Sequence, residues 1–362
     1  MAMTVNDFIP KSYSNQIENG SVTWESPSNI ALVKYWGKKA NQIPENPSIS
    51  FTLNTCKTIT TLTYTKKEER SNFDFEVYLD GKCNDGFKPK IQTFFERVLV
   101  HLPFLKDYHF KIETSNTFPH SSGIASSASG MSALALCLMS IEKKINPKMG
   151  LEFFNQKASF LARLGSGSAC RSIEGDLIVW GKTDVVEGSS NEFAIKYPYK
   201  VHDNFKNYQD TILLVDKGEK QVSSTVGHNL MHNHSFAKQR FEQAHENLFK
   251  LKQILELGNL NDFISLIESE ALTLHAMMMT SNPYFILMKP NTLKIINKIW
   301  DFRNRTNLPI GFTLDAGANV HILYPKKEAH RILEFIKNEL VAYCQNGHYI
   351  CDEIGLGANQ LL

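Results

Sequence analysis

The chain has 362 residues, with 39 basic and 37 acidic side chains and a formal net charge of only +2. This near balance argues against a surface built for nucleic acid or membrane binding, and 42% apolar with 21% charged residues is typical of a globular protein. One hydrophobic core rarely serves more than about 250–300 residues, so we expect two domains, at 1–190 and 191–362.

Residues 1–14 lack the apolar core of a signal peptide, and the longest apolar stretch, near 131–141, is far too short to span a bilayer. A cytoplasmic location is therefore expected, with no membrane partner. The six cysteines form no CxxC pair and are expected to be free thiols. Cys344, His348 and Cys351 offer three possible metal ligands without a fourth nearby, so no metal site is predicted in the chain.

The first half alternates extended and helical segments. Runs rich in Thr, Ile and Val predict strands, apolar residues at helical spacing predict helices, and Asp80-Gly81 predicts a hairpin turn. In chain order, strands are expected at 22–34, 48–64, 73–79, 108–114 and 176–180, with helices at 89–102, from about 126, and at 151–164.

The second half is richer in helices. Strands are expected at 211–215, 310–314 and 320–324, and helices at 237–257, 260–278, 291–303 and 326–343. Strands and helices grouped in this way predict two α+β layers rather than a strict βαβ array.

Residues 116–130 place two glycines and five serines between a strand and an apolar helix. Glycines let a backbone approach a ligand closely, and the start of the helix attracts anions, so the segment predicts a phosphate site. The alternative is a Ser-rich loop that caps the helix, for which one serine would suffice. The segment is neither a Walker A loop nor a GxGxxG fingerprint.

Three more segments carry charge at strand ends or in small-residue loops. Residues 29–38 end a strand with Lys34 and Lys38, and the alternative is a solvated strand end. Residues 165–172 join small residues and hydroxyls to Arg171, whose guanidinium suits carboxylate or phosphate, and the alternative is a flexible linker. Asp315 lies between an apolar strand and a Gly turn, where a turn cap is the better interpretation of the acid taken alone.

These segments resemble known motifs. Residues 119–129 resemble the ATP-binding PxxxGLxSSxS motif of the GHMP kinase superfamily, with Ile124 in place of leucine. Residues 29–38 resemble the NIAxxKYWGK signature of diphosphomevalonate decarboxylases, and 165–172 match the GSGSACRS motif of that family. Residues 312–319 resemble its TFDAGPN motif, with Ala318 where proline is usual. Four motifs in the same order are far more specific than any one of them.

The resemblance implies an α+β, two-domain GHMP-kinase-like fold, with a ribosomal-S5-like ATP-binding domain at 1–190 and the active site in the interdomain cleft. It also implies ATP-dependent decarboxylation of (R)-mevalonate 5-diphosphate to isopentenyl diphosphate, ADP, phosphate and CO2, a step of the mevalonate pathway of isoprenoid biosynthesis. ATP would phosphorylate the 3-hydroxyl, and the new phosphate would leave as the carboxylate is lost. A mevalonate 5-phosphate decarboxylase or a mevalonate 3-kinase remains the alternative.

The resemblance also implies roles for single residues. Asp315 would accept the proton of the 3-hydroxyl, Lys34 would compensate charge beside it, and Arg171 would fix the substrate carboxylate or diphosphate. The remaining substrate-binding set is Tyr35, Trp36, Gly37, Lys38, Lys90, Ser166, Gly167, Ser168, Ala169, Cys170, Ser224 and Thr225. The ATP-binding set is Asn116, Pro119, Ser121, Ser122, Gly123, Ser126, Ser127 and Ser129. The expected cofactors are ATP and the Mg²⁺ that arrives with it, and a homodimer is expected.

Two of these positions depart from the family pattern. Lys90 occupies a place where the family usually offers arginine to the diphosphate, and His228 follows the substrate-closing loop where methionine is common. Proteins of other classes fit the sequence less well. A non-catalytic ligand-binding relative need not keep the acid, the lysine and the phosphate loop together. A homoserine or galactose kinase would not carry both the 29–38 and the 165–172 segments.

Overall fold

Two long antiparallel strands, β1 (Asn19–Val33) and β2 (Ser48–Lys66), form the centre of the first lobe in the computed structural model. The structure describes residues 3–13, 15–119, 124–218 and 224–362. Within these residues eight strands share one sheet, whose main path runs β12-β1-β2-β5-β3-β4, while β6 pairs with β2 and β7 with β6. The other strands are β3 (Asp74–Leu79), β4 (Lys82–Cys83), β5 (Tyr108–Asn116), β6 (Leu177–Trp180), β7 (Ile195–Lys196) and β12 (Asn359–Gln360).

The burial of β1 and β2 shows which parts of the sheet are covered. From Cys56 to Tyr64, β2 alternates between buried and more exposed side chains, as expected of a strand with one face against helices. By contrast, residues 26–33 of β1 are all buried. This end of β1 is therefore enclosed on both faces, and Lys34 follows directly after it.

Three helices cover the inner face of the first sheet: α1 (Lys88–Val98), α2 (Ser126–Ile145) and α3 (Leu151–Gly165). Most of α2 is buried, because its sequence is apolar nearly all round and so suits a helix inside the lobe. The first turn of α2 lies at the carboxyl-terminal side of the Ser- and Gly-rich segment, as predicted.

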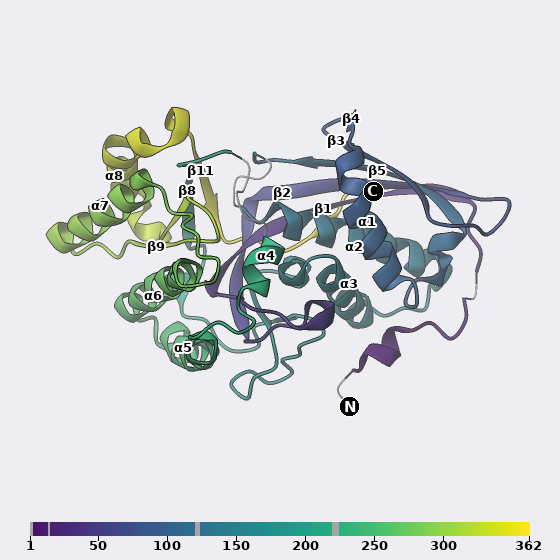
Figure 1. The fold of residues 1–362 in the computed structure, drawn as a ribbon, viewed down its shortest axis with the longest axis horizontal. Helices are drawn as coiled ribbons and strands as arrows, with labels where there is room; N and C mark the ends of the chain where they lie inside the picture. Colours follow the sequence, from purple (N-terminus) through teal and green to yellow (C-terminus); the bar gives the residue numbers. More distant parts are fainter. Residues whose placement is uncertain (1–2, 14, 120–123, 219–223) are drawn as a thin grey trace.

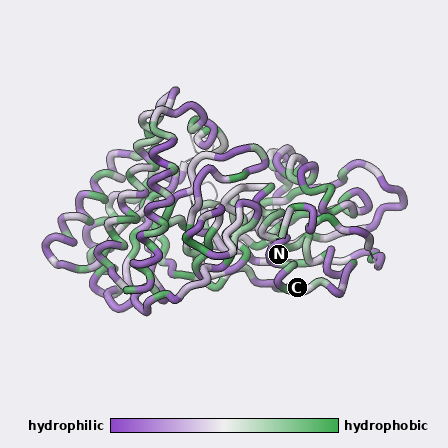
Figure 2. The backbone as a smooth tube through the Cα atoms, turned by 90° about the horizontal axis from the view of Figure 1, so that it is seen from below, coloured by the Kyte–Doolittle hydropathy of each residue, from purple (hydrophilic) through white to green (hydrophobic). Residues whose placement is uncertain are grey.

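Within the described residues the second lobe combines a small sheet with five helices, α4 to α8 (Figure 1). Its strands run in the order β11-β8-β10-β9 within the described residues. In Figure 2 the helices of this lobe carry both green and purple stretches along their length, as amphipathic helices do. The strands are β8 (Gln209–Leu213), β9 (Gly311–Thr313), β10 (Val320–Tyr324) and β11 (Tyr349–Glu353). The helices are the short α4 (Ser224–Asn229), then α5 (Ala237–Leu257), α6 (Leu260–Met279), α7 (Pro290–Thr306) and α8 (Ala329–Phe335).

The two lobes share a hydrophobic core. Ile30 and Leu32 of β1 and Phe51 of β2 belong to the same buried cluster as Leu248 of α5 and Phe263 of α6. Apolar packing of this kind makes the junction part of the folded core rather than a hinge between independent bodies.

The end of the chain also joins the lobes. After β11, residues 359–360 return to the first lobe as β12 and pair with Trp24 and Glu25 of β1. The buried Asp352 carboxylate on β11 accepts backbone N–H bonds from Asn54, Thr55 and Cys56 at 2.8–2.9 Å. The predicted α+β class with two domains is confirmed, while the division at residue 190 stays a prediction.

One predicted helix is wrong in its extent. Of the helix expected at 326–343, only Ala329–Phe335 is α-helical. A 3-10 turn, Lys326–Glu328, precedes it, and a π-helical turn, Ile336–Leu340, and a 3-10 turn, Val341–Tyr343, follow it. Its buried residues Ile332, Phe335, Ile336 and Leu340 keep a helix-like spacing, so the change of hydrogen-bond pattern leaves no trace in the periodicity.

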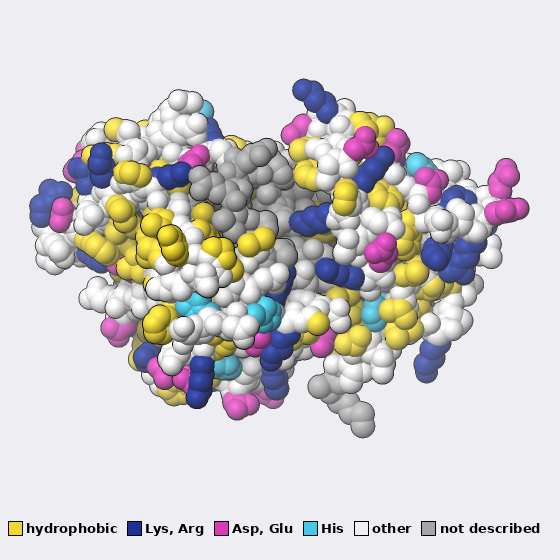
Figure 3. Space-filling view, in the orientation of Figure 1, with side chains coloured by type: hydrophobic (Ala, Val, Ile, Leu, Met, Phe, Trp, Pro, Cys, Tyr) yellow, Lys and Arg dark blue, Asp and Glu magenta, His cyan; other side chains and the backbone are white. Residues whose placement is uncertain are grey.

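The surface agrees with the balanced composition. Figure 3 shows basic and acidic side chains interspersed over both lobes on this face, without a continuous field of one sign. Among the helices of the described residues, none combines the length and the apolar character that crossing a membrane requires.

Candidate active site

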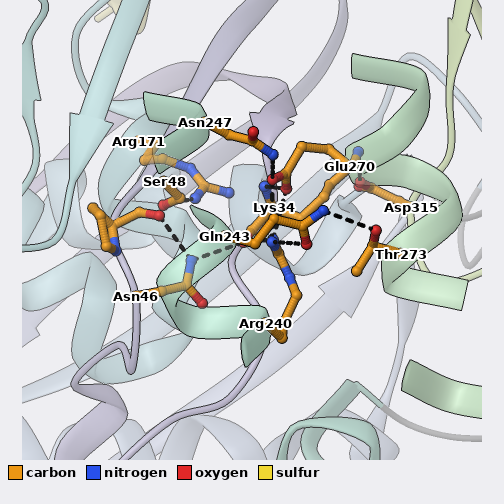
Figure 4. Close-up of polar contacts among 11 residues, drawn as sticks. Lys34, Asn46, Ser48, Arg171, Arg240, Gln243, Asn247, Glu270, Thr273 and Asp315 are labelled. Atoms are coloured by element: carbon orange, nitrogen blue, oxygen red, sulfur yellow. Dashed lines mark hydrogen bonds and ion pairs between the residues drawn. The ribbon is translucent and has the colours of Figure 1, made fainter. Parts of the chain in front are cut away.

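Lys34 and Asp315 meet at the junction of the lobes. Lys34 follows β1, and Asp315 lies in the turn between β9 and β10 (Figure 4). The Lys34 Nζ is 2.9 Å from the Asp315 Oδ1, and the two side chains are 2% and 28% exposed. Burial lowers the pKa of Lys34, the Asp315 carboxylate opposes that shift, and the charge of Arg171 adds a smaller lowering.

The backbone carbonyl of Asp315 is held by His275 on α6. The Nε2–H of His275 donates to the Asp315 backbone oxygen at 3.1 Å, which assigns the proton to that nitrogen. Burial lowers the pKa of His275 to about 4, so the ring is neutral near pH 7. His275 therefore fixes the backbone that carries the acid without adding charge beside it.

Arg171 projects from a buried 3-10 turn, Gly167–Ser172, that follows α3. Its Nε and Nη2 donate to the Asn29 Oδ1 at 3.3 and 3.2 Å, and its Nη1 donates to the Ser48 Oγ. These acceptors are neutral, and among the described residues Arg171 forms no salt bridge. Three of its five N–H groups are used in these bonds, and within the described residues the other two remain for a further anion on a guanidinium whose orientation is already fixed.

The aromatic residues after Lys34 pack against α4. The His228 ring lies 4.2 Å from the Tyr35 ring and 4.7 Å from the Trp36 ring, measured between centroids. Its Nδ1 accepts the backbone N–H of Gly37 at 3.0 Å. Burial lowers the pKa of His228 to about 3, with smaller contributions from the charges of Lys38 and Arg171, so the ring is neutral near pH 7.

Tyr35 also touches the 3-10 turn of Arg171. A Cβ on Gly167 would lie 2.7 Å from the Tyr35 Oη, so only glycine fits this approach. Within the described residues the buried Tyr35 hydroxyl has no hydrogen-bond partner. Ala169 and Cys170 are buried in the turn, and the Cys170 thiol donates to the Gly167 carbonyl, so these two support the turn rather than line an open space.

Lys38 and α1 bring further positive charge to the site. Burial lowers the pKa of Lys38, and the charge of Arg97 on α1 adds to the lowering. Lys90, the predicted ligand, is exposed in the first turn of α1, and Arg97 lies two turns later on the same helix face. Sequence reasoning missed Arg97, although its spacing of seven residues from Lys90 could have indicated it.

The phosphate segment is partly described. Ser126 and Ser127 open α2, and the Ser127 hydroxyl is 3.5 Å from that of Ser166, which brings this segment beside the Arg171 turn. Ser129 is buried and bonds the Thr58 hydroxyl at 2.6 Å, which in turn donates to the Asn116 Oδ1. The predicted positions Ser121, Ser122 and Gly123 lie outside the described residues, as do the side chains of Ser224 and Thr225.

Other predicted positions are described without such contacts to the ion pair. Ser168 is partly buried in the 3-10 turn, and its backbone carbonyl accepts a hydrogen bond from the Asn29 Nδ2 at 3.2 Å. Pro119 is exposed just before the gap in the description. Sequence reasoning missed Arg240, Glu270 and Asn46, which hold the backbone of Lys34, because isolated charged or amide residues in separate segments carry no local signal of burial.

Comparison with known proteins places the chain in a family. Residues 26–191 match the model of a diphosphomevalonate decarboxylase-like N-terminal domain, and residues 211–354 match that of a mevalonate 5-diphosphate decarboxylase C-terminal domain. The diphosphomevalonate decarboxylase of Candida albicans is 27% identical over 333 residues, covering 88% of this chain and 87% of that protein. That of Rattus norvegicus is 28% identical, covering 83% and 76%.

Solved structures agree. The crystal structure of mevalonate diphosphate decarboxylase from Staphylococcus aureus is similar with a TM-score of 0.81 and 28% identity, over 95% of this chain and 98% of that one. A complex described as MDDEF with MVAPP, AMPPCP and magnesium is similar with a TM-score of 0.80 and 28% identity, over 94% and 98%. The two family models together span both lobes and all of the charged site, and the chain therefore belongs to the diphosphomevalonate decarboxylase family of the GHMP kinase superfamily.

Proposed function

We propose that the chain catalyses the ATP-dependent decarboxylation of mevalonate 5-diphosphate to isopentenyl diphosphate, ADP, phosphate and CO2. The observation that carries this proposal is the ion pair between Lys34 and Asp315, formed at the lobe junction in a chain of this family. In this pair the Asp315 carboxylate is accessible to solvent and the Lys34 ammonium is buried. The positive charge of Arg171 interacts electrostatically with both groups.

Asp315 acts as the acceptor for the proton of the 3-hydroxyl. A tertiary alcohol is a poor nucleophile near pH 7, and a positioned base contributes typically about 10²–10⁴-fold. The Lys34 ammonium stabilises the carboxylate as an anion before the transfer and stabilises negative charge on the phosphoryl group during it. Because Asp315 is the more exposed partner, it is the member of the pair that the substrate contacts.

Arg171 holds the substrate carboxylate. Its planar fork is fixed by Asn29 and Ser48, and its two remaining N–H groups match the geometry of a carboxylate. Holding that carboxylate in one orientation prepares the C1–C2 bond for cleavage. The electron pair of that bond forms the C2–C3 double bond as the 3-phosphate leaves and CO2 is released. Lys38, with Lys90 and Arg97 on α1, supplies positive charge for the diphosphate end of the substrate.

ATP binds at the start of α2. The first turn of this helix carries no acidic residue, and Ser126 and Ser127 are accessible there, so the described residues fit a phosphate group. In the related MDDEF complex, AMPPCP and magnesium are bound together with MVAPP. Mg²⁺ would enter with the nucleotide and neutralise its phosphate charge.

The test measures ADP and CO2 together. The purified protein is incubated with Mg-ATP and either mevalonate 5-diphosphate or mevalonate 5-phosphate, with Asp315→Asn as the control. Equal amounts of ADP and CO2 from the diphosphate alone, abolished in the variant, are expected. Turnover of the monophosphate alone would identify mevalonate 5-phosphate as the substrate. ADP without CO2 would make the protein a 3-kinase, and no turnover of either compound would contradict the proposal.

Assembly and location form the last part of the proposal. A homodimer in the cytoplasm is expected from the family resemblance. Light scattering on the purified chain tests the first point, since a monomeric mass at the enzyme concentration of the assay would contradict it.

A further inference from the structure

A completely buried ion pair joins α5 to α6 behind Lys34. Arg240 and Glu270 are both 0% exposed, and they are linked by two bonds, from Nη2 to Oε2 at 2.6 Å and from Nη1 to Oε1 at 3.1 Å. Asn247 donates a further bond to the Glu270 Oε1 at 2.6 Å. Every oxygen of the carboxylate is therefore engaged (Figure 4).

The same two residues hold both polar groups of the Lys34 backbone. The Lys34 N–H donates to the Glu270 Oε2 at 2.9 Å, and the Lys34 carbonyl accepts from the Arg240 Nη2 at 3.1 Å. Because β1 ends at Val33, Lys34 has left the strand ladder, and side chains must satisfy its buried backbone. Asn46 supplies a second donor to the same carbonyl at 3.0 Å.

Resting on the proposed function, we infer that Arg240 and Glu270 are positioning residues for the reaction. They form a clasp that fixes the backbone of Lys34 so that its ammonium meets Asp315. They touch Lys34 and not the reacting atoms, so they act through Lys34.

The clasp is poorly explained by stability alone. Burying two charges is costly, and well-packed apolar residues of similar volume often serve a core as well or better. A geometric function explains why charges lie here, because only hydrogen-bonding groups can reach both the N–H and the C=O of one residue. The clasp has an electrostatic consequence too. Burial lowers the pKa of Lys34, the Asp315 charge opposes this lowering most strongly, and the Glu270 charge opposes it to a smaller extent.

Within the part of the chain that the structure describes, five charged or titratable groups face Lys34 from the surrounding elements. They are Asp315 in the β9–β10 turn, Glu270 and His275 on α6, Arg240 on α5 and Arg171 on the 3-10 turn. The neutral His275 contributes no charge near pH 7. Removing the Glu270 charge would leave Lys34 beside two guanidinium groups and one carboxylate, which favours the uncharged amine.

The first variant is Glu270→Gln, which keeps the length of the side chain and an oxygen for the Lys34 N–H. The matched control is Glu268→Gln on the same helix, because Glu268 forms a comparable two-bond pair with Arg303 at 2.6 and 3.0 Å but does not touch Lys34. We expect Glu270→Gln to lower kcat about 10²-fold, the scale of a small misplacement at a reacting site, with KM little changed. The basic limb of its kcat–pH profile should move to lower pH, while Glu268→Gln keeps the wild-type profile.

A double variant separates orientation from charge and guards against misfolding. Arg240→Met/Glu270→Gln removes both charges together and so leaves no unpaired ion in the core. Its basic limb should return towards that of the wild type, whereas kcat should stay low because the Arg240 bond to the Lys34 carbonyl is lost and only the Asn46 bond remains. Wild-type kcat and pH profile in all three variants would overturn the inference, as would equal losses in Glu270→Gln and Glu268→Gln.

An NMR titration measures the pKa of Lys34 directly, in protein labelled at the lysine side-chain carbons. It therefore tests the clasp without requiring turnover. A lower Lys34 pKa in Glu270→Gln than in Glu268→Gln supports the clasp even if the wild type turns over neither substrate, an outcome that would contradict the proposed function alone. Identical Lys34 titrations in the two variants would refute the electrostatic part of the clasp directly.

Discussion

The ammonium of Lys34 lies 2.9 Å from the carboxylate of Asp315, although 281 residues separate them in the chain. Their exposures are unequal, since Lys34 is buried and Asp315 keeps 28% of its side chain accessible. The cation is thus held inside the protein to act on an acid at the surface of the site. Such an arrangement favours function over stability, because desolvating an ammonium is costly.

Lys34→Met should lower the activity without lowering the stability of the protein. Met nearly matches the length of the lysine stem and removes the buried charge, while Asp315 can be solvated in its absence. We expect a loss of kcat of about 10²–10³-fold, the scale for removing one preorganised electrostatic group. The free energy of unfolding, measured with urea, should not fall. The control is Lys39→Met, an exposed lysine paired with Glu45, and a wild-type kcat in Lys34→Met would contradict the role proposed for Lys34.

The two serines Ser127 and Ser129 should differ, although both belong to the predicted ATP-binding set. Ser127 is exposed in the first turn of α2, whereas Ser129 is buried against Thr58. Ser127→Ala should raise the KM for ATP about tenfold, as expected for one hydrogen bond to a charged phosphate. Ser129→Ala should instead cost about 1–2 kcal/mol of stability through the lost buried bond.

Steady-state kinetics and urea unfolding of both serine variants test this division. Unfolding of Ser127→Ala should stay within about 0.5 kcal/mol of the wild type, as usual for a surface substitution. A raised KM for ATP in Ser129→Ala with unchanged stability would show that the buried serine turns towards the nucleotide.

Gly167→Ala should strain the contact between the Arg171 turn and Tyr35. The new methyl group would lie 2.7 Å from the Tyr35 Oη and 3.1 Å from the Trp180 ring. Overpacking of a buried site typically costs about 1–3 kcal/mol. Adding Tyr35→Phe removes the closest atom and should restore part of the lost stability, measured by thermal unfolding. Equal instability of the single and double variants would place the strain elsewhere.

The regular elements of the fold were predictable because their signals are local. The helix expected at 237–257 and the strand expected at 320–324 have those limits in the structure, and the Asp80-Gly81 turn joins β3 to β4 with positive φ at both residues. Such elements depend on their own periodicity and turn residues. By contrast, β11 and β12 were not predicted, since two to five residues become strands only through the distant partners β8 and β1.

The candidate site was predictable only through resemblance. Nothing in the local sequence distinguishes Asp315 from a turn cap, yet the structure places it against Lys34. The clasp was not predictable at all. Arg240 and Glu270 lie on helices with several other charged residues, where a charge usually indicates a solvated face, and burial of these two depends on how α5 and α6 pack against the end of β1.

His228 should make the protein less stable in acid. Its folded-state pKa is about 3, while a free histidine has a pKa of about 6.5, so between these values the unfolded state binds more protons than the folded state. Stability therefore rises with pH across this range and is lost as pH falls below about 6.5, until the folded ring is protonated as well. Between pH 7 and pH 5 the expected loss from this one ring is about 2 kcal/mol.

His228→Asn isolates that contribution. The Asn oxygen can accept the Gly37 N–H in place of the Nδ1, but it cannot take up a proton in this range. Stability at pH 7 should fall because the packing on Tyr35 and Trp36 is lost, while the difference in unfolding free energy between pH 7 and pH 5 should shrink by about 2 kcal/mol. His101 and His275, whose pKa values burial lowers to about 4, keep their own acid dependence in both proteins. The control is the exposed His330→Asn, and an unchanged pH difference in His228→Asn would mean that the ring is already solvated in the native state.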